Sequence, residues 1–286
     1  MNRIIALTAL GLMVGGCANA PLDRAGSLSS YDSLTPSNGV LTHSLVKVAK
    51  DDVLTAKTVR IVPTAFSEAA TATPLSVKQR NLITNAVDRS LCDGLADRFQ
   101  IVASAAQADL TIHAVVTHIV PTNASMAGAS KVASLAPSFL FPSVPVPVPR
   151  IPIGLGSLSL EAEARDPSGG QKAAMIWGRG ANSFTSSPRV SADGDAYDLA
   201  AAFGADFSKL LVKGDTPFGK MPSLPSARAI GRAFGKGRPP ACAVFGKSPG
   251  VVGMIGDKVG LPPAWTDKGA AAASSRTDQA VAPVTD

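Results

Sequence analysis

The strongest constraint on the fold is a pair of adjacent segments that alternate and are joined by a turn. Residues 158–165 alternate apolar and polar side chains, the period of two that is typical of a β-strand. Residues 166–170, Asp-Pro-Ser-Gly-Gly, have turn composition with proline at the second position. Residues 173–178 are again mostly apolar. This order predicts a β-hairpin and favours an antiparallel sheet.

The remaining periodic segments predict two helices and further strands. Strand-like segments cover residues 57–66, 100–103 and 109–120. Ser76 and Gln79 have the spacing of a capping box, and the apolar stripe that follows predicts a helix ending near Phe99. A second helix is expected from Asp193 to Lys213, stopped by Gly214. The expected fold is α+β, with an antiparallel sheet of about five strands and two helices packed on one face.

Two regions fall outside this periodic core, and the chain contains 26 Gly and 22 Pro. Residues 124–156 are expected to be a Pro-rich insertion, in which residues 143–150 favour polyproline II. Its Phe139-Leu140-Phe141 can contact lipid or a partner, and packing on its own sheet is the alternative. Residues 215–286 lack sustained periodicity and predict a flexible, low-complexity tail with a few short ordered pieces.

Positive charge is concentrated in that tail. Residues 220–258 hold seven Lys or Arg and one Asp, a net charge of +6, which equals the formal charge of the whole chain. A basic segment of this kind is a candidate contact for anionic lipid headgroups or lipopolysaccharide, and a merely solvated tail is the alternative.

The N-terminus has the pattern of a secretory signal. Arg3 is followed by 11 uncharged residues, 4–14, which as a helix rise about 16 Å and cannot span the ~30 Å hydrocarbon core. Val14-Gly15-Gly16-Cys17 resembles a bacterial lipobox, in which Cys17 is lipidated and becomes the first mature residue. Cleavage by the ordinary peptidase within residues 18–20 is the alternative. Ala18, in place of Asp, favours the outer membrane and the periplasm.

These features divide the chain into four parts. The signal peptide covers residues 1–16 and a tether covers residues 17–26. The α+β domain covers residues 27–214, and the tail covers residues 215–286. Nucleic acid is excluded as a partner by the expected compartment.

Two further cysteines can form a bridge. Once Cys17 is acylated, Cys92 and Cys242 are an even pair in an oxidising compartment. A disulfide would dock the apolar segment around Cys242 onto the first helix. Two independent thiols are the alternative, because the sequence does not show whether their Cα atoms come within ~7 Å.

Three stretches of the chain resemble one family of bacterial lipoproteins. Residues 25–36 resemble the opening motif of domain of unknown function 3313, although Ser27 stands where Phe is usual. Residues 108–123 resemble its middle strand, and residues 161–170 resemble its E-x-E-x-x-D hairpin. The resemblance covers about residues 26–214. It implies an anchored envelope protein without assigned activity, and it supplies no catalytic residues.

Few residues offer chemistry. Glu161 and Glu163 share one strand face at about 7 Å, a spacing that suits a two-carboxylate glycosidase. The simpler expectation is that they face water and pair with Arg165, Lys172 or Arg179. His113 and His118 are five positions apart, so on a regular strand they point to opposite faces and cannot share a metal.

One catalytic motif matches by spacing alone. Residues 246–250 fit the G-x-S-x-G elbow, but no His follows them, and Pro249-Gly250 is not expected to open a normal helix. No cofactor motif is complete in the chain.

The sequence therefore predicts a lipid-anchored, non-catalytic envelope lipoprotein. Its expected partners are the membrane, through acyl chains on Cys17, and an envelope protein, lipid or glycan. The alternative is an envelope-polymer hydrolase that uses Glu161 and Glu163.

Overall fold

The computed structural model describes residues 20–102, 106–140, 150–219 and 239–270, with only the backbone for residues 134–140. Cys17, its lipobox and the proline-rich residues 143–149 lie outside these ranges. Among the described residues, no helix combines the length and hydropathy needed to cross a membrane.

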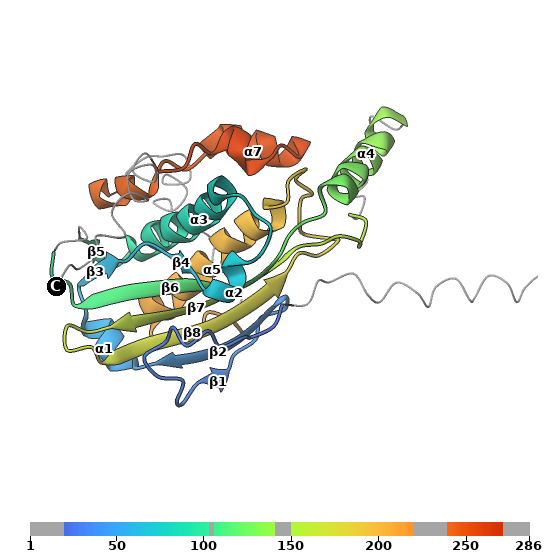
Figure 1. The fold of residues 1–286 in the computed structure, drawn as a ribbon. Helices are drawn as coiled ribbons and strands as arrows, with labels where there is room; N and C mark the ends of the chain where they lie inside the picture. The colour runs from blue at the N-terminus through green and yellow to red at the C-terminus, as the bar shows by residue number, and fades with distance from the viewer. Residues whose placement is uncertain (1–19, 103–105, 141–149, 220–238, 271–286) are drawn as a thin grey trace, which may run out of the picture.

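The centre of the domain is one mixed sheet of eight strands, in the order β1-β2-β8-β7-β6-β3-β5, with β4 beside β6 (Figure 1). The strands are β1 (Thr35–Pro36), β2 (Thr42–Val48), β3 (Thr58–Ile61), β4 (Ala65–Phe66), β5 (Gln100–Ile101), β6 (Leu110–Val120), β7 (Ser157–Arg165) and β8 (Gln171–Gly180). The predicted hairpin is present as β7 and β8, whose antiparallel register pairs Glu161 with Ile176.

The helices are α1 (Lys50–Thr55), α2 (Glu68–Thr71), α3 (Val77–Leu95), α4 (Ala124–Leu140), α5 (Gly194–Lys213), α7 (Gly250–Val259) and α8 (Pro263–Thr266), with a 3-10 helix η1 (Pro240–Phe245). The capping box at the start of α3 is confirmed, since the Ser76 side chain accepts from Gln79 N and the Gln79 side chain accepts from Ser76 N. Helix α5 ends at Gly214, which has a left-handed φ of 60°.

The mixed α+β class is confirmed, but the expectation of about five antiparallel strands is wrong. Strands β3, β4 and β5 run parallel to their neighbours, because the chain crosses over through α3 before it returns to the sheet. Residues 57–66, expected to be one strand, are divided into β3 and β4. Strand β5 lies within the strand expected at residues 100–103. Strand β1 has two residues, too few to show alternation, so the sequence did not reveal it.

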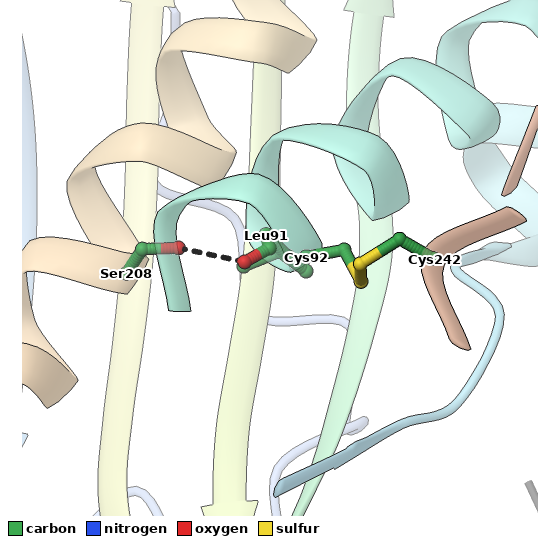
Figure 2. Close-up of a disulfide and its surroundings, with 4 residues drawn as sticks. All are labelled: Leu91, Cys92, Ser208 and Cys242. Carbon is green, nitrogen blue, oxygen red and sulfur yellow. Dashed lines mark hydrogen bonds between the residues drawn. A yellow bond between two sulfur atoms is a disulfide. The ribbon is translucent and has the colours of Figure 1, made fainter. Parts of the chain in front are cut away.

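Helices α3 and α5 lie side by side over one face of the sheet and form the main core with it (Figure 1). Trp177 of β8 stacks edge-on against Phe203 of α5 with ring centroids 5.7 Å apart, and its Nε1 donates to Asp206 at 3.1 Å. The two helices approach closely at Gly94, where an added Cβ would lie 2.6 Å from the Ser208 side chain. Ser208 Oγ donates to the Leu91 carbonyl across this crossing (Figure 2).

The Pro-rich insertion begins as a helix. Residues 124–140 form α4, and Asn123 Oδ1 accepts from Met126 N at its start. The sequence analysis predicted no helix in this insertion, so α4 adds an element that it missed. Alanine is abundant here, and its high helix propensity agrees with the observed helix.

The C-terminal segment is ordered over residues 239–270. Cys92 of α3 and Cys242 of η1 form a disulfide with their Cα atoms 5.9 Å apart, and both are fully buried (Figure 2). Arg89 forms a buried ion pair with Asp267, whose Oδ2 also accepts from Tyr197 Oη at 2.7 Å. The few short ordered pieces expected in the tail are present as η1, α7 and α8, but the expected separation of the tail from the 27–214 domain is wrong for residues 239–270. The links that hold them are long-range, so local periodicity could not reveal them.

The start of α7 corrects a second expectation about this segment. Pro249 is the N-cap and Gly250 is the first residue of the helix, so this dipeptide does open a helix. The residues before it form η1 instead of the strand that a nucleophile elbow requires.

We predict that the disulfide makes a large contribution to stability. A Cys92→Ala, Cys242→Ala double variant should lose up to about 5 kcal/mol of unfolding free energy, because the bond closes a loop with a sequence separation of 150 residues. Denaturant unfolding of the variant, compared with the native protein with and without reductant, measures this loss. Equal stability of the oxidised native protein and the variant would contradict the prediction.

Candidate functional site

The polar face of the β7–β8 hairpin is covered by the N-terminal part of the chain. We name residues 20–31 the N-terminal strap. It lies on the sheet face opposite α3 and α5, where Leu28 is buried against Ala174 and Ile176 of β8 in a small second core. Two glutamates of β7, spaced by the strand period, point at this strap.

Glu161 is fully buried and receives donors from three strap residues. Its Oε1 accepts from Ala25 N at 3.1 Å, and its Oε2 accepts from Ser27 N at 3.3 Å and Ser27 Oγ at 2.5 Å. Tyr31 Oη donates to it at 2.8 Å. Burial and the bond to Glu161 raise the pKa of the Tyr31 hydroxyl, so this group remains a donor.

Glu163 holds the next part of the strap. Its Oε2 accepts from Ser29 N at 2.8 Å, Ser29 Oγ at 2.6 Å and Gln171 Nε2 at 2.9 Å. Its Oε1 lies 3.1 Å from Arg165 Nε. Burial alone would raise the pKa of Glu163, but the bonds from Ser29 and Gln171 and the charge of Arg165 together lower it below its usual value.

The expectation that these carboxylates face water is therefore wrong. Glu161 and Glu163 are 0% and 1% exposed, and donors from the strap surround them. Only the pairing with Arg165 was anticipated. A signal was present in the sequence, because Ser27, Ser29 and Tyr31 lie in the opening segment that carries the family resemblance. Nothing in the local pattern showed which strand that segment covers.

The strap runs along β7 in a defined direction. Ser159 Oγ donates to the Pro21 carbonyl at 2.5 Å, while Ser29 lies further along β7 at Glu163. An added Cβ at Gly178 would lie 2.9 Å from the Ala20 carbonyl oxygen, so only glycine permits this approach. One end of the sheet contains the last residues of β6 and β8 and the first residues of β7. We name it the Ala20 end. Residues 20–26, expected to be part of a tether, are instead attached to the sheet.

Two histidines of β6 share the strap face. The β6–β7 register shifts between Val116 and His118, which is a β-bulge, and it reverses the alternation of the strand. His113 pairs with Glu163, and His118 pairs with Ser159 and places Nδ1 3.7 Å from Asp23 Oδ2. The expectation of opposite faces is wrong for this reason. The described residues contain no group of three or more His, Cys, Asp or Glu side chains able to hold a metal ion.

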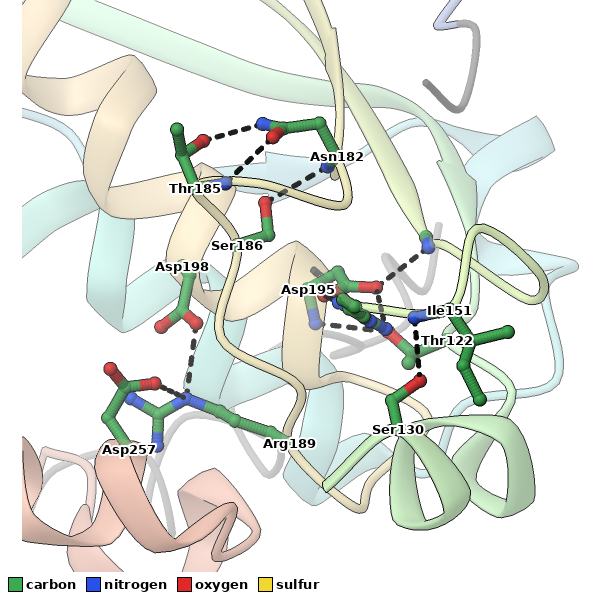
Figure 3. Close-up of polar contacts among 12 residues, drawn as sticks. Thr122, Ser130, Ile151, Asn182, Thr185, Ser186, Arg189, Asp195, Asp198 and Asp257 are labelled. Atoms are coloured by element: carbon green, nitrogen blue, oxygen red, sulfur yellow. Dashed lines mark hydrogen bonds and ion pairs between the residues drawn. The ribbon is translucent and has the colours of Figure 1, made fainter. Parts of the chain in front are cut away.

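The loops at the Ala20 end are fixed by buried polar contacts (Figure 3). Arg150 pairs with Asp195, and the two side chains are 2% and 1% exposed. Asp195 Oδ2 also accepts from Gly156 N at 2.8 Å, and its own amide donates to Thr122 Oγ1 at 3.0 Å. These contacts attach the loop before β7 to the first turn of α5.

The neighbouring loop, residues 181–193, has its own supports. The buried Asn182 side chain accepts from Phe184 N at 3.0 Å and Thr185 N at 2.8 Å, and its amide donates to Thr185 Oγ1. Arg189 Nε lies 3.1 Å from Asp198 Oδ2 and 3.4 Å from Asp257 Oδ1, which joins this loop to α5 and α7 (Figure 3).

A groove of about 670 Å³ runs along the crossing of α3 and α5. Small residues of the two helices, such as Ala86, Ser90 and Ala201, line it together with five charged residues, Arg89, Asp93, Asp97, Lys209 and Lys213, and Pro249. A cavity of this volume is within the range of ligand sites, but its charges have mixed signs and define no single ligand class.

Comparisons with known proteins support a family and little beyond it. Residues 23–207 match the family model described as protein of unknown function (DUF3313). No curated protein matches the chain.

Two solved structures are distantly similar, both of the PelC dodecamer from Paraburkholderia phytofirmans. One, of a PelC variant, has 10% identity and a TM-score of 0.32, covering 63% of this chain and 96% of that chain. The other has 11% identity and a TM-score of 0.33, covering 60% and 98%.

We predict that Glu161→Gln releases the strap. The introduced amide would place an NH₂ donor opposite the donors of Ser27 and Tyr31. Because hydrogen bonds to a charged group are lost, the free energy of unfolding should fall by about 2–3 kcal/mol. Hydrogen exchange at residues 25–31 should accelerate. Glu68→Gln, which changes an exposed glutamate of α2, is the matched control. Unchanged protection of the Ser27 amide would contradict the assignment.

Strap attachment should also depend on pH. The pKa of Glu163 is lower in the folded protein than its usual value of 4.5, so its contribution to stability is complete above that value. It should be lost as the pH falls through the lower folded pKa. Urea unfolding at several pH values between about 6 and 3 measures this. A Glu163→Gln variant should lose this part of the pH dependence, and an unchanged profile would refute it.

Proposed function

This chain belongs to the DUF3313 family, and we propose that it is a lipid-anchored, non-catalytic lipoprotein that binds a partner in the periplasm. The observation that carries the proposal is the position of Ala20. It is 5% exposed against the sheet and stands three positions after the lipobox cysteine, Cys17. The chain thus passes almost directly from the proposed lipid to the folded domain.

The short distance determines how such an anchor would act. Three residues span at most about 11 Å, so acyl chains on Cys17 would hold the sheet close to the bilayer surface. A long linker would let the domain move away from the membrane. The hydrogen bonds to Glu161 and Glu163 would keep the strap on the sheet. The strap could then not detach and become part of a longer linker to the membrane.

The structure supports binding more than hydrolysis. Glu161 and Glu163, the two carboxylates of the alternative hydrolase, are covered by the strap, and no observation favours that alternative. An exposed surface is instead present on α7, where Gly253 and Gly256 face the protein. Its aliphatic side chains face outward and are 52–64% exposed: Val251, Val252, Met254, Ile255 and Val259. Contiguous exposed apolar residues are typical of interaction surfaces.

The proposed contact of basic residues with anionic lipid or lipopolysaccharide involves mostly residues that lie outside the described ranges. Lys247 and Lys258 are described, and residues 220–238 are not. For α7 we propose an envelope protein as the partner, because its exposed aliphatic side chains lie close together on one short helix.

We predict that Cys17→Ser abolishes lipid attachment and leaves the fold intact, because Cys17 precedes every described contact. Metabolic labelling with a fatty-acid analogue should mark the native protein and not the variant. Thermal unfolding of the variant should match that of the native domain. Label on the variant, or a native mature N-terminus at Ala18 or later, would contradict the proposal.

A further inference from the structure

We propose that the Ala20 end of the domain is a membrane-contact face that rests on the bilayer holding Cys17. The contact would be made by the projecting half of α4 and by the exposed side chains of Ile153 and Phe184. This inference rests on the proposed lipid anchor and adds to it the orientation of the domain on the lipid surface.

The chain leaves the domain at the Ala20 end. The strap passes Glu163, Glu161 and Ser159 in turn as it is followed back toward the N-terminus, so it reaches the Ala20 end last. Cys17 is three positions further, within about 11 Å. The lipid surface must therefore lie close to this end of the sheet, and any group that projects from it would approach the bilayer.

Helix α4 has a packed first half and a second half that projects and carries no charge. Its first turns are packed, with Ala127 and Ser130 buried and an added Cβ at Gly128 3.9 Å from the Val190 side chain. Beyond Lys131 the helix leaves the domain, and Val132 is 71% exposed. Figure 1 shows α4 extending past the rest of the domain. Residues 132–140 contain no charged side chain and rise about 13 Å.

The base of this projection is held firmly. Ser130 Oγ accepts from Ile151 N at 3.2 Å (Figure 3). The adjacent Arg150 forms a buried ion pair with Asp195. Lys131 Nζ turns inward to the Asp257 carbonyl at 3.4 Å. Helix α4 is thus attached at a fixed place, and its one charged side chain is used within the protein.

The two neighbouring loops expose large apolar side chains. Phe184 is 82% exposed at the tip of the turn that Asn182 organises, and Ile153 is 60% exposed. The charged residues in loops 150–156 and 181–190 are Arg150 and Arg189, and both are buried in ion pairs. In these two loops large apolar groups face outward while both charged side chains face inward, and the exposed charges nearby, Asp23 and Arg24, belong to the strap.

A bilayer is the occupant that fits these observations. A protein partner would have to enter the short space between this end and the leaflet that holds Cys17. Apolar side chains that enter the boundary between headgroups and acyl chains gain burial, and a second contact of this kind strengthens a lipid anchor. Helix α7 starts beside the α3–α5 groove, which Pro249 lines, and reaches the loop of Arg189 only near its C-terminal end, at Asp257. Val251, at its N-terminal end, is therefore not part of the proposed contact.

The test uses single introduced thiols in the full-length lipidated protein. With Cys92 and Cys242 bridged and Cys17 acylated, Val132→Cys, Phe184→Cys and Val251→Cys each supply one free thiol for an environment-sensitive fluorophore. Val251 is the matched control, because it is an exposed valine on α7. Each labelled protein is placed in phosphatidylethanolamine–phosphatidylglycerol vesicles with or without brominated acyl chains. Circular dichroism verifies the fold.

We expect labels at positions 132 and 184 to shift to the blue and to lose most of their fluorescence to brominated lipid, while the label at 251 stays unchanged. Co-flotation with vesicles reports the anchor separately. Protein that floats without quenching at 132 and 184 overturns the contact face alone, as does equal quenching at 251. Native protein that carries no lipid and does not float overturns the proposed function itself.

Discussion

Two carboxylates are buried under the N-terminal strap, and the sheet face opposite α3 and α5 depends on this interaction. An unpaired buried carboxylate costs several kcal/mol, so Glu161 and Glu163 can occupy β7 only because donors meet them. Ser27, Ser29 and Tyr31 provide these donors from the strap. The same contacts bring Leu28 onto Ile176 and close the second core. Removing the strap would expose both charges and that core together.

The opposite face depends on links between distant parts of the chain. Helices α3 and α5 cover the sheet, and the C-terminal segment is attached to them by the Cys92–Cys242 disulfide and the Arg89–Asp267 pair. A disulfide restricts the unfolded chain, whereas a buried ion pair chiefly penalises loss of one partner. The two contacts therefore stabilise the segment by different mechanisms, although its composition suggested little structure.

Contacts on both faces of the sheet determine which groups lie at the Ala20 end, where the proposed lipid anchor would be. The strap determines where the N-terminal chain leaves the sheet, and Arg150–Asp195 determines where α4 projects. If Cys17 is acylated, these two fixed points give the domain one orientation on the membrane. Helix α7 starts at the α3–α5 groove, away from the Ala20 end, so the exposed side chains at its N-terminal end would remain available to a periplasmic partner.

The sequence by itself determined the α+β class, the β7–β8 hairpin, the capping box of α3 and the end of α5 at Gly214. These features depend on local periodicity and on backbone preferences, and a short stretch of sequence contains both. It also identified the family and left the Cys92–Cys242 bridge as one of two alternatives. Tertiary structure alone decided that Glu161 and Glu163 are buried, that His113 and His118 share a face, and that residues 239–270 pack. The burial of the glutamates and the packing of residues 239–270 depend on segments more than 20 residues away, and the shared face of the histidines depends on a bulge. Neither a distant segment nor a bulge changes the local sequence pattern.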